Sequence, residues 1–131
     1  MSALNYICST LLGLTIAFII ISDPASAHHG MAAFDTTAPV TLKGTVTDFH
    51  FVNPHCVIEF DVTDEKGKVQ SWKAELTSPN HLVGKGWTES SLQAGDQVAV
   101  TGYRAKNGAL SIWVTKLRMA NGQELKIYTS N

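Results

Sequence analysis

Residues 56–76 read CVIEFDVTDEKGKVQSWKAEL, and their polarity pattern is the clearest in the chain. Apolar and polar residues alternate over 56–62 and again over 69–76, as in two strands that each bury one face. The segment between them, 64–68, is polar and contains glycine, which is typical of a turn. The stretch therefore predicts a β-hairpin.

The register of this hairpin follows from its two faces. The apolar sets of both strands face the same side only if the numbers of paired residues sum to an even value, because a slip of one residue turns a strand over. A three-residue loop, 65–67, with Gly67 in the left-handed conformation meets this condition. The predicted pairs are Phe60–Trp72, Ile58–Ala74 and Cys56–Leu76 on the inner face and Glu59–Lys73 on the outer face.

Further strands are predicted on both sides of the hairpin. Alternation over 40–47 indicates a strand that continues to about Phe51, where Asn53-Pro54 ends it because proline cannot donate to a ladder. Ser78-Pro79 begins a short helix, with serine as the N-cap. Strands at 97–104, 109–119 and 124–128 are separated by Asn-Gly turns at 107–108 and 121–122. The sequence does not decide which face of the strands at 97–104 and 109–119 is buried, because both strands read apolar on alternate residues.

The order of these elements is three strands, a short helix, two strands and one extra strand. This is the order of the OB-fold, a partly open five-stranded barrel with its helix between strands three and four. We predict an all-β, OB-fold-like barrel of five to six strands over residues 40–131, with an N-terminal arm at 28–39. Another small barrel of the SH3-like type is the alternative, which the position of the helix disfavours.

Residues 1–27 resemble a secretory leader. The apolar run 7–21 has the length of a signal-peptide core and is short for a bilayer span, which needs about 20 residues. Small residues in Ala25-Ser26-Ala27 fit the positions that a signal peptidase reads. We expect cleavage after Ala27 and a periplasmic or secreted domain that is not embedded in the membrane. A retained membrane anchor is the alternative, because 1–27 contain no lysine or arginine.

Composition limits the classes of partner. The 131 residues contain 10 basic and 11 acidic side chains, a net charge of −1, and no basic run, which argues against nucleic acid as a partner. Cys56 is the single cysteine after the leader, so no internal disulfide is expected. Neither a nucleophile motif, a metalloprotease motif nor a phosphate-binding loop occurs, and we therefore predict no catalytic residues and no enzymatic activity.

Several short blocks together are similar to a known family. The chain resembles small exported bacterial proteins of unknown function whose mature domain opens with two histidines. This resemblance implies export and a single β-barrel domain, and it brings no activity. The matching blocks are 28–35 (HHGMAAFD), 42–46 (LKGTV), 53–55 (NPH), 75–80 (ELTSPN) and 95–102 (GDQVAVTG).

The new N-terminus is the best candidate for chemistry. After cleavage, His28 offers its amine and its ring Nδ1 to one metal, and both groups deprotonate readily near neutral pH. Nitrogen ligands in a planar arrangement suit Cu(II), so we predict copper or a similar transition metal. A third nitrogen comes most easily from His55, which follows the Asn53-Pro54 turn on the face opposite Cys56. His29 is a weaker candidate, since adjacent side chains point in different directions.

Each candidate also has a plainer interpretation. In this interpretation, His28 and His29 belong to a solvated terminus and bind no partner, and the His55 side chain forms hydrogen bonds only within its turn. His50 and His81 are predicted to be surface residues. Glu75 faces outward as a surface charge or a carboxylate ligand, and Cys56 is a small core residue.

The aromatic residues raise a second class of function. OB-folds bind oligonucleotides or sugars by stacking on one face, but the outer face of the predicted hairpin has no aromatic residue. We therefore expect most aromatic side chains in the core. The rival hypothesis is an exported module that binds a protein, a peptide or a small molecule and holds no metal. The aromatic residues considered are Phe49, Phe51, Trp87, Tyr103 and Trp113.

Overall fold

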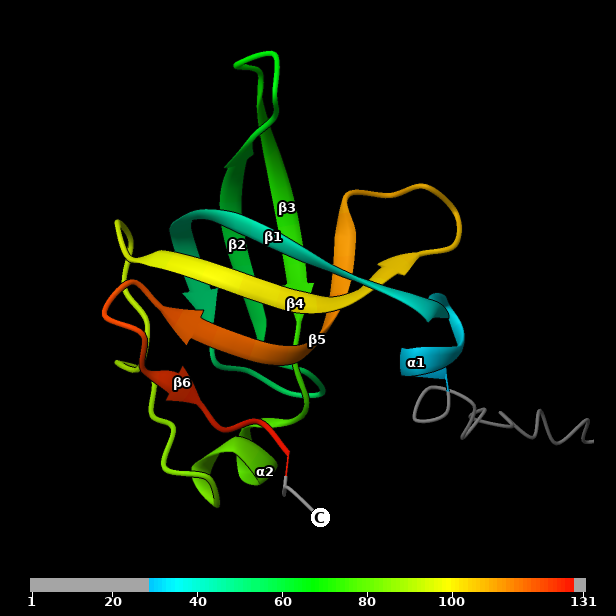
Figure 1. Cartoon of the computed structure of the whole chain (residues 1–131). Helices are drawn as coiled ribbons and strands as arrows, with labels where there is room; N and C mark the ends of the chain where they lie inside the picture. Colours follow the sequence, from blue (N-terminus) through cyan, green and yellow to red (C-terminus); the bar gives the residue numbers. More distant parts are fainter. Residues whose placement is uncertain (1–28, 129–131) are drawn as a thin grey trace, which may run out of the picture.

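The structure, a computed structural model, describes residues 29–128, so the expected leader and His28 lie outside it. Strands dominate, with two short helices among the described residues (Figure 1). None of the helices in this range is long and apolar enough to span a bilayer. The elements are α1 (His29–Ala32), β1 (Phe34–His50), β2 (Val57–Thr63), β3 (Val69–Glu75), α2 (Pro79–Val83), β4 (Gln97–Ala105), β5 (Ser111–Met119) and β6 (Glu124–Leu125).

The strands close into a ring. The long strand β1 pairs with both β2 and β4, and β5 pairs with β4, all antiparallel. A short parallel pairing between β3 and β5, which sets Glu75 opposite Trp113, closes the barrel. Together with α2 between β3 and β4, this connectivity confirms the all-β, OB-fold-like prediction. The β2–β3 hairpin extends beyond the barrel at one end, and α2 lies at the other (Figure 1).

The predicted hairpin register is correct. Phe60 lies opposite Trp72, and Glu59 lies opposite Lys73. Gly67 has a positive φ of 79°, as the three-residue loop requires. Both strands bury their inward residues, so the alternating pattern and the loop length lead to the same pairing.

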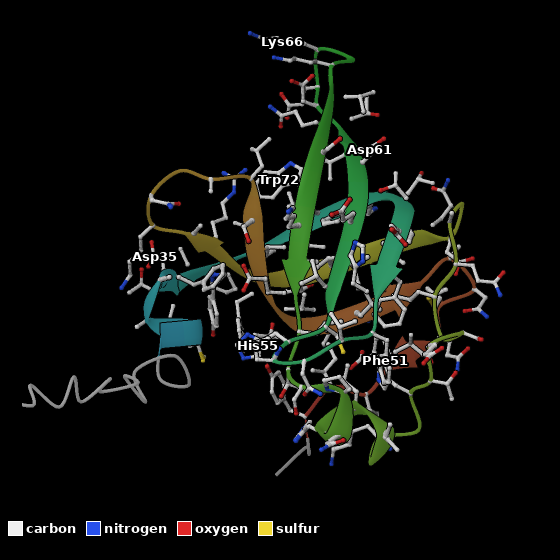
Figure 2. The ribbon with its side chains drawn as sticks, turned by 180° about the vertical axis from the view of Figure 1, so that it is seen from behind. Asp35, Phe51, His55, Asp61, Lys66 and Trp72 are labelled. Atoms are coloured by element: carbon white, nitrogen blue, oxygen red, sulfur yellow. The ribbon has the colours of Figure 1, made fainter. Side chains whose placement is uncertain are left out.

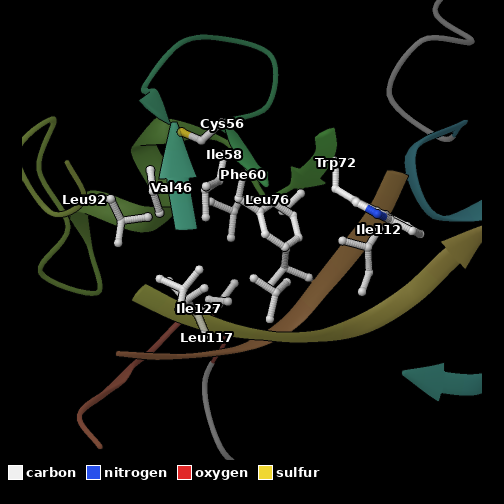
Figure 3. Packing of buried hydrophobic residues seen from close by; sticks show 14 of the residues in the cluster. Val46, Cys56, Ile58, Phe60, Trp72, Leu76, Leu92, Ile112, Leu117 and Ile127 are labelled. Atoms are coloured by element: carbon white, nitrogen blue, oxygen red, sulfur yellow. The ribbon is translucent and has the colours of Figure 1, made fainter. Parts of the chain in front are cut away.

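The core lies inside the ring (Figure 3). Phe60 and Ile58 of β2 are completely buried, and so is Leu76 directly after β3. Each such side chain contributes about 1.5–3 kcal/mol through its removal from water. Cys56 is a fully buried core residue, as predicted, and Trp87 is 3% exposed and packs in the same cluster.

A bulge in β5 explains why its buried face could not be predicted. Ile112 and Val114 point into the core, but so does Leu117, which breaks the alternation. The pairing with β4 shifts here, since Val114 pairs with Gly102 and Lys116 pairs with Thr101. Residue 115 is therefore the extra residue of a β-bulge, which reverses the phase of the strand.

The two largest differences from the predicted strand boundaries lie at the start of β1 and at the end of β6. β1 begins at Phe34, inside the expected arm 28–39, because Phe34 is buried and pairs with Ala105 of β4. The terminal strand ends at Leu125 instead of 128, because side chains occupy its next carbonyl groups. Trp87 Nε1 donates to the Lys126 carbonyl at 2.7 Å, and His81 Nε2 bonds the Ile127 carbonyl at 3.0 Å.

Candidate functional site

A pocket of about 350 Å³ opens where α1, the turn before β2 and the β4–β5 loop meet. Figure 2 shows His55 at this side of the barrel, beside α1. The pocket combines one imidazole, one carboxylate, one amide and one hydroxyl side chain with glycine and apolar residues. It is lined by Gly30, Ala33, Phe34, Pro54, His55, Glu75, Ala105, Asn107, Ala109 and Ser111.

His55 is positioned by the turn before it and by an aromatic neighbour. The Asn53-Pro54 peptide is cis, and His55 follows it directly. Its half-buried ring packs perpendicular to the Trp113 indole, with ring centroids 5.3 Å apart. Within the described chain, neither ring nitrogen of His55 has a hydrogen-bond partner. The prediction that His55 lies outside the core while Cys56 lies inside it is correct.

Gly30 brings the N-terminal segment against this histidine. A Cβ atom added to Gly30 would lie 3.3 Å from His55 Cε1 and 3.2 Å from Trp113 Cζ3. A larger residue at this position would require the rings or the backbone to shift by a few tenths of an ångström. The β4–β5 loop holds the same segment, because Lys106 donates its backbone N–H to Ala33 and its Nζ to the Ala32 carbonyl, each at 2.9 Å.

Glu75 supplies the carboxylate of the pocket. It ends β3, is half-buried, and accepts a hydrogen bond from Ser111 Oγ at 3.1 Å. The prediction that Glu75 faces outward is correct, but this side chain lies in the pocket wall and is not an isolated surface charge. The β3–β5 closure, which joins residues far apart in the sequence, places it there.

Trp113 anchors a second aromatic cluster outside the main core. Trp113 is buried, at 8% exposed, but it does not belong to the main core cluster. It packs instead on Phe34, with ring centroids 5.8 Å apart. Its Nε1 donates to the Tyr128 hydroxyl at 3.1 Å. Burial raises the pKa of Tyr128, and the hydrogen bond from Trp113 opposes that shift. Sequence reasoning missed this supporting role of Trp113.

The other histidines lie elsewhere. His50 Nε2 is 3.4 Å from a Glu59 oxygen and 3.5 Å from an Asp48 oxygen at the end of β1. His81 is exposed in α2, as predicted. His28 and the side chain of His29 lie outside the described part of the molecule. The described residues alone contain no group of three or more His, Cys, Asp or Glu side chains that could hold a metal ion.

A family model matches residues 17–112 of the chain, and the family is described as DUF6152, a family of unknown function. The chain belongs to this family. The matched range contains the sequence blocks that indicated a family of unknown function. Membership in DUF6152 assigns no activity to the chain. No curated protein sequence matches the chain significantly.

Solved structures resemble this DUF6152 protein only in part. A ZRD-deleted mutant of TiaS in complex with agmatine has 22% identity and a TM-score of 0.46, over 70% of this chain and 24% of that one. A tRNA fluorescent labeling enzyme has 20% identity and a TM-score of 0.42, over 62% of this chain and 17% of that one. The chain spans about a quarter or less of either protein, and neither likeness informs its function.

Proposed function

We propose that this DUF6152 protein is an exported β-barrel protein that binds copper, or a similar transition metal, at its mature N-terminus. The His28 amine and ring provide two nitrogen ligands, and His55 provides the third. The observation that carries the proposal is the contact between Gly30 and His55, since an added Cβ at Gly30 would lie 3.3 Å from the imidazole.

Chain length makes the arrangement feasible. Consecutive Cα atoms are about 3.8 Å apart, so the Cα atom of His28 lies within about 7.6 Å of that of Gly30 in any conformation. A chain that begins at His28 therefore has the reach to bring the amine and ring of His28 to His55. The ring nitrogens of His55 have no hydrogen-bond partner within the described residues. Either nitrogen can therefore bind a metal when it is unprotonated, as a metal-binding imidazole must be.

The pocket provides a further metal ligand beside His55. The Glu75 carboxylate lines the same pocket as His55 and is available as an additional oxygen ligand. An N-terminal His chelates a metal through a six-membered ring, and the planar nitrogen set favours Cu(II) among divalent first-row metals. His29 contributes less directly in this proposal, because its side chain starts from the adjacent residue and diverges from that of His28.

Export and metal binding are coupled in this proposal. The His28 amine is free only if the leader is cleaved after Ala27, so the peptidase creates one of the ligands. A metal site of this kind is absent from the uncleaved chain, where that nitrogen is part of an amide. The protein therefore acquires its metal in the compartment where cleavage occurs.

The decisive experiment compares two N-termini. A chain beginning at His28 and the same chain with its α-amine acetylated are titrated with Cu(II) and followed by EPR. We expect acetylation to weaken binding by at least about tenfold, a loss that removal of an outer-shell partner alone can cause, and to change the nitrogen hyperfine pattern. Tight copper binding that is unchanged by acetylation overturns the proposal.

Two histidine variants test whether copper binds specifically at His55. His55→Gln removes the proposed third nitrogen and is expected to lower copper affinity by about tenfold or more. His50→Gln is the matched control, because His50 lies at a strand end beside Asp48 and Glu59 and does not line the pocket. Equal effects of the two variants exclude His55 as a ligand. Absence of copper binding in all chains favours a metal-free binding module.

A further inference from the structure

A second pocket of about 330 Å³ lies beside the β4–β5 loop. Ala105 and Ala109 line this pocket as well as the first, whereas His55 and Glu75 do not. The second pocket contains an arginine and no acidic residue. Its lining consists of Gln70, Trp72, Arg104, Ala105, Gly108, Ala109 and Leu110.

Arg104 is the one charged group in this pocket. Its guanidinium carbon lies 4.8 Å from the centroid of the Trp72 ring, in a cation–π arrangement. Within residues 29–128, no carboxylate lies at ion-pair distance from Arg104. Arg118 of the neighbouring strand, in contrast, lies 3.9 Å from Glu124. A guanidinium that lies over an aromatic ring and has no carboxylate partner retains N–H groups that can bind an anion.

Trp72 gives a second, independent observation. The residue is 2% exposed, and its Nε1–H is buried without a hydrogen-bond partner in the described chain. Figure 3 shows Trp72 at the margin of the core cluster. Buried donors are nearly always satisfied, and an unsatisfied one is destabilising. The ring that carries this unpartnered donor lines the second pocket and lies under the Arg104 guanidinium.

We propose that this pocket binds a small organic carboxylate. The carboxylate accepts hydrogen bonds from the Arg104 guanidinium and lies within the same pocket as the Trp72 indole. The apolar part of the ligand packs against Ala109 and Leu110, of which Leu110 is 40% exposed. A planar carboxylate matches the fork of an arginine, and a volume of this size suits a small molecule. The site is independent of the metal proposal.

The test observes the Trp72 indole directly. The protein is expressed from the full-length chain with ¹⁵N labelling, and the assigned Nε1–H resonance of Trp72 is followed by NMR during titration with hexanoate. We expect a saturable shift of this resonance with hexanoate and no saturable shift with hexanamide, the neutral analogue of the same shape. Titration with inorganic phosphate forms the second arm, because phosphate also binds arginine.

Two exposed arginines form a matched pair for this test. Arg104→Gln is expected to weaken hexanoate binding by at least about tenfold, since a charge-assisted hydrogen bond is lost. Arg118→Gln, on the next strand, is expected to leave the affinity unchanged. Equal affinities in Arg104→Gln and the parent overturn the proposal, as does saturation by hexanamide. Saturation by phosphate alone also overturns it, because the site then selects a different anion.

Discussion

The His55 and Trp113 rings pack perpendicular to each other, with ring centroids 5.3 Å apart and planes at 89°. Gly30 lies against both rings, so three segments that are distant in the sequence meet at one place. The imidazole is thereby held by packing and not by a hydrogen bond within the described residues. Its nitrogens therefore carry no hydrogen bond within residues 29–128, while Trp113 and Gly30 flank the ring. This combination suits a ligand that must be both positioned and unoccupied.

Gly30→Val tests whether α1 depends on this contact. An added Cβ at Gly30 would lie 3.2–3.3 Å from Trp113 and His55, so α1 or the rings must shift by a few tenths of an ångström, and the two further methyl groups of valine need more room. Overpacking of this kind costs about 1–3 kcal/mol, which predicts that α1 detaches and that amide exchange of Lys106, bonded to Ala33, accelerates by about tenfold. Ala32→Val, at an exposed position of the same helix, is the control. Equal exchange rates in the two variants show that α1 is not docked.

Leu117→Ala and Lys116→Ala test the bulge in β5. Because Leu117 is fully buried, its truncation is expected to lower the free energy of unfolding by about 2–5 kcal/mol. Lys116 is exposed and lies 3.7 Å from Glu124, so its truncation should cost at most about 1 kcal/mol. Urea denaturation measures both values. The reverse order of effects indicates that the alternation of β5 continues without a bulge.

The fold was predictable where two constraints agree. In the β2–β3 hairpin, the apolar faces and the length of the loop lead to the same register, so Phe60–Trp72 pairing follows from sequence alone. In β5 no such second constraint exists, and the bulge before Lys116 reverses the pattern without a local sequence signature. The first part of β1, 35–39, is exposed, and β4 pairs with this region only at its two ends, through Phe34–Ala105 and Pro39–Tyr103.

The candidate site was predictable only in part. The alternating pattern places His55 outside the core, because Cys56 belongs to the apolar set. The neighbours of His55 depend on the closure of the barrel, which sets Glu75 opposite Trp113 across the β3–β5 pairing. Contacts of this kind join residues far apart in the chain, and no local pattern encodes them. The close approach of Gly30 is likewise visible only in three dimensions.

Cys56 predicts a loss of stability at alkaline pH. Burial raises the pKa of the Cys56 thiol above 9.0, although a hydrogen bond from the Val52 backbone opposes the shift. The thiol ionises more easily in the unfolded chain, so the folded state is favoured less as the pH rises above 9.0. We expect the urea midpoint to fall between pH 8 and pH 10, and to fall less steeply in Cys56→Ala. Parallel slopes for the two proteins contradict this assignment.

Tyr128→Phe tests the hydrogen bond that supports Trp113. The Tyr128 hydroxyl accepts from Trp113 Nε1 at 3.1 Å, and the indole is 8% exposed, so the variant leaves a nearly buried donor without its partner. We expect a loss of about 0.5–1.5 kcal/mol in the free energy of unfolding and a shift of the Trp113 indole N–H resonance. Tyr103→Phe, on half-buried Tyr103 of β4, is the control and should change stability by less than about 0.5 kcal/mol. If Tyr128→Phe is as mild as the control and leaves the indole resonance in place, the two side chains are not bonded in solution.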